Sequence, residues 1–295
     1  MHIIRPWNDR KQFSRGFTLV EVLIVVVLGV IITAAVIGVL YSFIFSFEQT
    51  DDITTARQRG EMVLSILEGP ILHAGLGMPS SLDQFSGLTL LNTWTSPVEI
   101  PTGVNSGEIR LVYSVPTEIY QDSEVSFDSG DITLSLKSPS DNDVDLVTDL
   151  ALVDTISNTT KAWILFPTAN SCFRVKGNDT VEPSSAGSGM IAQYDRLHYL
   201  RALEAKVENG EFKVRDIVNS ASTFQPTVEG IQKICFVLDK DVLSVYVLAR
   251  GNKLDNDLDL TRPISGWDDS ILPTIDQDLK KYRLSVVKGS WRIRN

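Results

Sequence analysis

A single carboxylate, Glu21, lies near the start of an apolar stretch that runs from Phe17 to Phe47 and holds no other charge. An acidic side chain within a membrane span costs roughly 2.5–3.5 kcal/mol at the centre and less near an interface. One interpretation is that Glu21 is simply tolerated at headgroup depth. The other is that it awaits a cation, because a cut between Gly16 and Phe17 would create an α-amino group within one helical turn of it. In a side-by-side helix assembly, the amine of one copy could pair with the carboxylate of another, which would specify register even if the net energy is small.

Two acidic loops contain alternating aspartates, which could offer several oxygens to Ca²⁺. The first loop holds Asp141, Asp143, Asp145 and Asp149, and the second holds Asp255, Asp257 and Asp259. Neither matches the EF-hand, because Leu146 or Leu260 occupies the sixth position, where Gly is needed, and no Glu follows at the twelfth. We expect solvated turns here, with Ca²⁺ as the alternative, and no other cofactor.

The chain has two cysteines, Cys172 and Cys235, and both lie in strand-like stretches. A bridge between them would close a loop of roughly 60 residues and stabilise the fold by up to a few kcal/mol on the chain-entropy estimate. It would form only in an oxidising compartment outside the cytoplasm. The sequence favours the bridge slightly over two buried thiols, although it gives no separation of the two Cα atoms.

Residues for catalysis do not come together in the sequence. No two of the three histidines stand at zinc-ligand spacing, and Ser188 lacks the G-x-S-x-G elbow of a nucleophilic serine. A glycine motif for phosphate is missing as well. The formal net charge of −10 argues against nucleic acid as a partner, because phosphate recognition needs a basic stripe. We therefore expect no enzymatic activity.

The apolar stretch exceeds the roughly 20 residues that a transmembrane helix needs. It is also too long for the apolar core of a secretory signal peptide. The preceding charges are Arg5, Arg10, Lys11 and Arg15 against Asp9 alone. This excess of cations predicts that the N-terminus stays in the cytoplasm and that everything after Phe47 lies outside it.

The run R-G-F-T-L-V-E, from Arg15 to Glu21, resembles the cleavage and methylation signal of the type IV pilin and type II secretion pseudopilin superfamily. The resemblance implies that an aspartic prepilin peptidase removes residues 1–16 and N-methylates Phe17. It also implies that Glu21 recruits and registers subunits in a filament. The implied partners are this peptidase, other minor and major pilins that contact the N-terminal helix, and an inner-membrane assembly platform.

Beyond Phe47 the helical pattern becomes amphipathic. The apolar residues at helical spacing are Ile53, Ala56, Val63, Leu64 and Leu67. Arg57 and Glu61 can pair at i, i+4, and Gly69-Pro70 predicts a break or a kink. We expect one helix over about 17–68, with residues 17–47 for the membrane and assembly, and residues 48–77 as the amphipathic half and connection.

From residue 78 onward the sequence predicts an antiparallel β-domain that extends to residue 295, with a variable middle over about 82–190. The strand-like runs are 108–115, 131–137, 162–166, 172–176, 194–207, 212–218, 231–238, 242–249 and 282–294. Asn209-Gly210 and Lys240-Asp241 predict hairpin turns. The fold class is thus α+β, a long N-terminal helix packed on an antiparallel sheet. Trp267 lies between loop residues and is expected to be exposed.

Four further segments carry a finer resemblance. They are H-A-G-L-G at 73–77, V-E-G-I-Q-K-I-C-F-V-L-D at 228–239, V-L-S-V-Y-V-L-A-R at 242–250 and the ending W-R-I-R-N. The first three segments resemble the PilW group of large minor pilins and the J-type minor pseudopilins of type II secretion. The ending is similar to the short aromatic-arginine-asparagine ending of the PilW group, and the length also favours PilW. The resemblance implies a minor pilin that primes and caps a type IV pilus, first in the inner membrane and then at the pilus tip. The alternatives are a J-type subunit at the tip of a secretion pseudopilus, or a tip adhesin that binds through residues 82–190.

Overall fold

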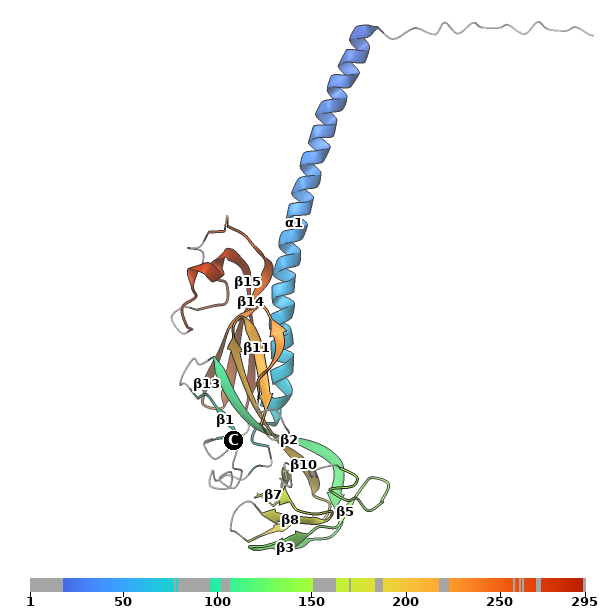
Figure 1. Cartoon of the computed structure of the whole chain (residues 1–295), viewed down its shortest axis with the longest axis vertical. Coiled ribbons are helices and arrows are strands. Elements are labelled where there is room, and N and C mark those ends of the chain that lie inside the picture. The colour runs from blue at the N-terminus through green and yellow to red at the C-terminus, as the bar shows by residue number, and fades with distance from the viewer. Residues whose placement is uncertain are drawn as a thin grey trace, which may run out of the picture. The chain divides into compact units, whose positions relative to one another are not determined.

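The computed structural model describes most of the chain from Thr18 onward. The described residues are 18–76, 78, 96–101, 107–150, 163–169, 171–183, 188–217, 223–256, 258–259, 261, 263–268 and 272–293. They form one long helix and many antiparallel strands, as the sequence predicted (Figure 1). Contacts divide the chain into two units, Met1–Asp51 and Asp52–Asn295.

The long helix, α1 (Leu19–His73), is 55 residues long. Its part in the first unit is apolar on all sides, and the large apolar side chains from Leu19 to Phe47 are exposed. The helix is long and apolar enough to cross a membrane, and none of its apolar window is buried by the protein. A helix with no polar side suits an apolar solvent, because all backbone groups between its ends are bonded internally.

Of the break or kink predicted at Gly69-Pro70, the break is wrong, because α1 continues through Pro70 to His73. Pro70 lacks one N–H group, so it removes a single bond of the last turn. The His73 ring lies 2.9 Å from the carbonyl oxygen of Gly69, and Ile71 is fully buried, so this last turn is held by other contacts. The predicted Arg57–Glu61 pair is present at 2.8 Å.

The second unit contains two main sheets and a small one, and every strand pair in them is antiparallel. The large sheet holds β1 (Val98–Glu99), β2 (Glu108–Gln121), β4 (Ile132–Thr133), β5 (Leu136–Lys137), β6 (Trp163–Phe166), β7 (Ser171–Val175), β8 (Thr180–Pro183), β10 (Arg196–Glu208), β11 (Glu211–Asp216) and β12 (Gln225–Glu229). The second sheet holds β13 (Ile231–Asp239), β14 (Val242–Leu254) and β15 (Tyr282–Arg292), and the 3-10 helix η2 (Gln277–Lys281) precedes β15. The small sheet pairs β3 (Val125–Phe127) with β9 (Gly189–Ile191).

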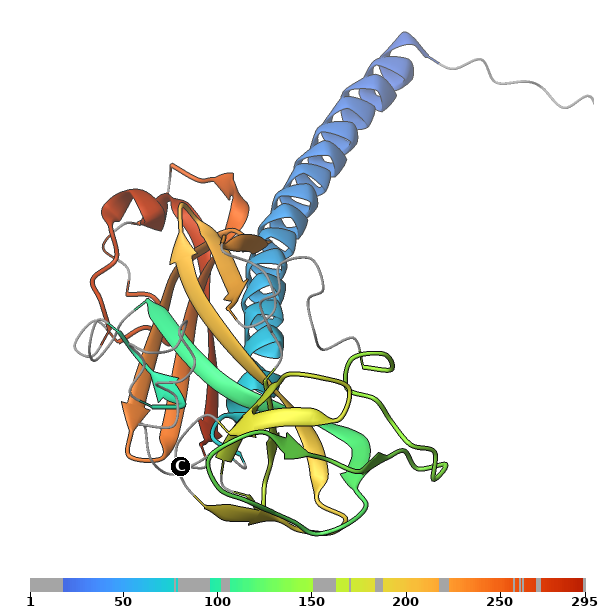
Figure 2. The ribbon, with the colours of Figure 1, turned by 60° about the horizontal axis from the view of Figure 1, so that its bottom comes forward.

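The second unit has two lobes, which share the long strands β2 and β10 (Figure 1). In the helix lobe, Val63, Leu67 and Ile71 of α1 join one apolar core with residues of β2, β10, β11 and β13–β14. The strand lobe has a separate core, built from β3–β9 and the far parts of β2 and β10. The pairing of β2 with β10 shifts register between Arg196 and His198, within the strand lobe. Figure 2 shows these lobes from a second direction.

Each predicted strand run overlaps an observed strand, although the run at 131–137 is divided between β4 and β5. Both predicted hairpin turns are confirmed, with φ of 55° at Asn209, 76° at Gly210 and 55° at Lys240. Strands β1, β3, β8, β9 and β12 were not predicted. None of these exceeds five residues, so alternation had little length in which to show itself.

The predicted exposure of Trp267 is wrong. Its side chain is only 5% exposed and lies in a core cluster with Leu248 and Ile275, where the segment before η2 covers one face of the second sheet. The indole Nε1–H donates to the carbonyl oxygen of Pro273 at 3.1 Å. The polar neighbours of Trp267 in the sequence suggested exposure. Its ring is buried because residues distant in the sequence, such as Leu248, pack against it.

Candidate functional site

The predicted cleavage site, Gly16 and Phe17, lies outside the described residues, which begin at Thr18. Thr18 precedes α1, and its hydroxyl Oγ1 accepts the backbone N–H of Glu21 at 3.3 Å. A Thr followed three residues later by Glu is the capping-box pattern of helix N-termini. Glu21 thus belongs to the first turn of α1, where the partial positive charge of the helix end favours a carboxylate. The spacing could have revealed this capping role from the sequence alone.

The surface of α1 in the first unit can contact lipid or other apolar helices. Glu21 is its only charged side chain between Thr18 and Phe47, and that side chain is exposed. A Cβ added to Gly29 or Gly38 would meet nothing within 4 Å, so a second helix has room to approach closely at both points. The Thr33 hydroxyl bonds to the Gly29 carbonyl at 2.8 Å and is therefore satisfied within its own helix.

A second carboxylate of α1, Asp52, belongs to the second unit and was not singled out in the sequence. It is 5% exposed, and its Oδ1 accepts the backbone N–H groups of Asn252 at 2.6 Å and of Lys253 at 3.2 Å. Gly251 lies directly opposite, since a Cβ there would be 2.2 Å from Oδ2 of Asp52. Only glycine permits this approach, and the contact ties α1 to the end of β14.

Arg59 makes a second tie to the same strand. Its guanidinium donates to the carbonyl oxygen of Arg250 at 2.8 Å and to Oδ1 of Asn252 at 2.6 Å. One turn away from Ala56, Gly60 lies so close to β15 that an added Cβ would be 2.6 Å from Cγ2 of Val287. Together these contacts fix the α1 residues of the second unit on the second sheet.

The buried face of α1 differs from the predicted one. The buried residues are Asp52, Ala56, Gly60, Val63, Leu67 and Ile71. Ile53, which was expected on this face, is 44% exposed, and Leu64 is half-buried. The prediction followed apolar side chains, whereas the helix approaches the sheet most closely through a glycine and a bonded carboxylate.

Three of the four aspartates of the first acidic loop, Asp141, Asp145 and Asp149, bond to the protein's own donors, and the Asp145 carboxylate accepts the Thr148 hydroxyl at 2.9 Å. Asp141 lies 3.2 Å from the amine of Lys137, and a carboxylate oxygen of Asp149 accepts the backbone N–H of Asp145 at 2.9 Å. Asp143 pairs with Lys137 only through the backbone. These contacts give the loop a structure without an ion.

In the second acidic loop, Asp255 pairs with Arg283 at 2.8 Å, and Asp259 accepts the backbone N–H of Thr261 at 2.9 Å. Asp257 lies outside the described residues. Within the part of the chain that the structure describes, no three His, Cys, Asp or Glu side chains form a group that could hold a metal. Calcium at either loop stays a prediction.

The predicted bridge between Cys172 and Cys235 is not formed. Both thiols are free and buried, and they belong to different core clusters, because Cys172 lies on β7 of the large sheet and Cys235 on β13 of the second sheet. Burial raises the pKa of Cys172 to about 12 and the pKa of Cys235 to about 11. Both are therefore unreactive thiols that act as small apolar side chains.

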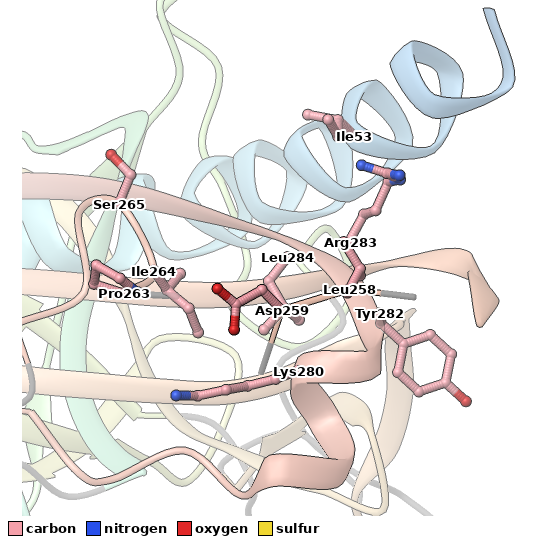
Figure 3. A pocket seen from close by; sticks show the side chains of 10 residues that line it. All are labelled: Ile53, Leu258, Asp259, Pro263, Ile264, Ser265, Lys280, Tyr282, Arg283 and Leu284. Carbon is pink, nitrogen blue, oxygen red and sulfur yellow. The ribbon is translucent and has the colours of Figure 1, made fainter. Parts of the chain in front are cut away.

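One open cavity, of about 210 Å³, lies beside the start of β15 (Figure 3). Figure 3 shows Ile53 of α1 on one side, with Asp259 and Ile264 of the preceding loop and Lys280 of η2 around the opening. Its lining contains neither histidine nor cysteine among the described residues. Asp259 accepts the backbone N–H of Thr261. The lining residues therefore show no nucleophile that is hydrogen-bonded to a general base.

Comparison with known proteins identifies the N-terminal segment. Residues 11–37 match the family described as the prokaryotic N-terminal methylation motif. The match supports the resemblance at the level of the type IV pilin and pseudopilin superfamily, and it supports a pilin-like substrate of prepilin peptidase with a membrane-anchoring N-terminal helix. No curated protein and no solved structure matched the chain.

Proposed function

We propose that this chain is a PilW-like minor pilin that helps to prime the assembly of a type IV pilus and caps it. The observation that carries the proposal is the continuity of the motif at residues 11–37 with α1, whose apolar surface from Leu19 to Phe47 is left uncovered by the protein. Uncovered apolar surface of this extent needs lipid at first and other helices later.

The proposed route begins in the inner membrane, which the chain crosses once with its N-terminus in the cytoplasm and its β-domain in the periplasm. Prepilin peptidase cleaves after Gly16 and N-methylates Phe17. The new amine of one subunit then pairs with Glu21 of a neighbour, and the inner-membrane platform moves the complex outward. The partners are other minor and major pilins, which contact the first unit of α1.

The size of the second unit supports a tip position. A ten-stranded sheet and a three-stranded sheet follow α1 in one unit. A subunit of the repeating shaft must leave room for its neighbours along the whole filament, whereas a subunit at the end meets neighbours on one side only. A J-type minor pseudopilin would satisfy the same requirement, so the two machines must be separated by experiment.

The first test is the intact mass of the protein from its native cells. We expect a chain that starts at N-methylated Phe17, whereas retention of Met1–Gly16 in cells with active prepilin peptidase would contradict the proposal. A Gly16→Val variant should keep its leader. Gly29→Ala is the matched control, because Gly29 has open space around it and should be processed normally.

The second test separates pilus from pseudopilus. Deletion of the gene should reduce the number of surface pili, and the full-length gene, but not the Gly16→Val variant, should restore it. Normal piliation together with a loss of protein secretion would instead assign the chain to a secretion pseudopilus.

A further inference from the structure

The strand lobe presents two neighbouring tyrosine rings on its surface, and neither tyrosine was singled out in the sequence. Tyr194 is 66% exposed and lies in the turn between β9 and β10. Its ring centroid is 5.8 Å from that of Tyr120 on β2, and the ring planes are inclined by 50°. We call these two rings the tyrosine platform.

Tyr194 occupies a backbone conformation that a bulky residue rarely adopts. Its φ is 64°, and it stands third in a four-residue turn that the N–H of Asp195 closes on the carbonyl oxygen of Ala192 at 3.2 Å. Glycine or asparagine usually takes a position of positive φ in such a turn. The exposed ring recovers little of this cost by burial, so the fold alone gives no reason for a tyrosine here.

The turn is held firmly from both sides. The Tyr194 N–H donates to the carbonyl oxygen of Gln121 at 2.7 Å, and the Gln121 N–H donates to that of Asp195 at 3.0 Å. A carboxylate oxygen of Asp195 also accepts the backbone N–H of Thr168 at 2.9 Å. The Gln121 side chain is fully buried beneath the turn. Tyr194 is thus preorganised, which lowers the entropic cost of binding a ligand.

Polar groups of both signs border the platform. The Tyr120 hydroxyl donates to Oδ1 of Asp141 at 3.4 Å, and the Lys137 amine lies 3.2 Å from the same oxygen and 3.4 Å from Oδ2 of Asp122. Asp141 is 74% exposed, so its remaining lone pairs face solvent. The border therefore offers hydrogen-bond acceptors and a donor within reach of one small ligand.

We infer that the tyrosine platform binds a neutral saccharide. The C–H face of a pyranose ring suits the flat, electron-rich face of Tyr194, and its hydroxyls can both donate to Asp141 and accept from Lys137. A polyanion is disfavoured by Asp122 and Asp141, and a quaternary ammonium is disfavoured by the Lys137 amine. Two rings are also too small an area for a stable protein interface. The inference does not depend on the role in filament assembly.

The test is saturation-transfer NMR on the full chain in a detergent without a sugar headgroup. The probes are the methyl glycosides of glucose, galactose, N-acetylglucosamine and N-acetylgalactosamine, each at millimolar concentration, with glycerol as the reference. We expect saturation of the ring C–H protons of at least one glycoside. No saturation above the glycerol level for any of the four would overturn the inference.

Tyr194→Asn removes the ring and suits a positive φ, so it should reduce the saturation at least fivefold without lowering Tm. Asp141 also has a positive φ, of 61°, which Asn tolerates. Asp141→Asn therefore keeps the side-chain shape while it removes the charge, and it should reduce the saturation more mildly. Met190→Ala is the control, because Met190 is 45% exposed on the same lobe and should not matter. An unchanged signal in Tyr194→Asn, or an equal loss in Met190→Ala, would contradict the assignment.

Discussion

Each of the two units contains one carboxylate of α1 in a position that costs free energy, Glu21 in the first unit and Asp52 in the second. The surroundings of these two carboxylates are opposite. Asp52 is buried and accepts two backbone N–H groups from the end of β14. Glu21 is exposed on an apolar surface, and its carboxylate bonds to none of the described residues. The partner of Asp52 lies within the chain, whereas we propose that the partner of Glu21 comes from a neighbouring subunit.

This difference separates stability from assembly. A carboxylate that accepts hydrogen bonds inside the fold contributes to the free energy of unfolding, because its removal leaves the donors that it bonds unpaired. An exposed carboxylate contributes little to that quantity. In our proposal it acts when the α-amino group of a neighbouring subunit is brought to it, and the methylation motif at residues 11–37, which includes Glu21, supports this proposal. Substitutions at the two sites should therefore affect different measurements.

The largest effect on stability is expected for Gly251→Ala. The new Cβ would lie 2.2–2.4 Å from three carboxylate atoms of Asp52, so α1 or β14 must shift. We expect the free energy of unfolding of the second unit to fall by about 3 kcal/mol, the upper end for overpacking. Chemical denaturation of the full chain in micelles, followed by Trp fluorescence, measures this.

The control for Gly251→Ala is the double variant Asp52→Ala/Gly251→Ala. Removal of the Asp52 carboxylate leaves room for the Cβ, so the loss of the double variant should be smaller than the sum of the two single losses by more than about 1 kcal/mol. Strict additivity would show that the two residues do not meet.

Asp52→Ala alone should cost about 2 kcal/mol, because the backbone N–H groups of Asn252 and Lys253 lose a buried acceptor. Asp52→Asn keeps one oxygen and should cost less. The neighbouring Asp51 is exposed, so Asp51→Ala should change the free energy of unfolding by no more than about 0.5 kcal/mol. Equal effects of Asp52→Ala and Asp51→Ala would remove the contrast with Glu21.

Local signals made much of this fold predictable. The period-two runs gave the long strands, and Asn209-Gly210 gave a hairpin because its positive φ values are properties of the two residues themselves. The motif around Glu21 was equally local. In contrast, Asp52 and the backbone of Asn252 are 200 residues apart in the sequence, so the residues near Asp52 do not predict its hydrogen bonds. The separation of Cys172 from Cys235 depends on sheet topology in the same way.

His198, like Asp52, is a buried polar side chain whose partner lies within the fold, and histidine is a residue type with a pKa near neutral. Its ring Nδ1 lies 3.1 Å from Oγ of Ser114, whose hydroxyl also bonds to the carbonyl oxygen of Leu76 just after α1. Burial lowers the pKa of His198, with smaller contributions in the same direction from His73 and Arg196 and an opposing one from Asp195.

Since the folded pKa of His198 is below the unfolded one, the unfolded chain binds the proton more readily. The contribution of this ring to stability is present above the unfolded pKa, near 6.5, and is lost as pH falls through the folded value. We expect Tm to fall between pH 7 and pH 5, and this decrease to be smaller in His198→Asn. An identical decrease in both proteins would assign the acid sensitivity to other groups.

The smallest effect on stability is expected for Glu21→Gln, which removes the charge of Glu21 while it keeps the shape. The unfolding curve of the second unit should be unchanged, because the carboxylate bonds to nothing in that unit. The number of filaments per cell should nevertheless fall, since an amide cannot form the ion pair with the α-amino group of Phe17 in a neighbour. Glu21→Asp keeps the charge on a shorter side chain and should lie between wild type and Glu21→Gln. If Glu21→Gln cells assembled normal numbers of filaments, Glu21 would be only a first-turn carboxylate that the positive end of the helix favours, and the contrast with Asp52 would reduce to exposure alone.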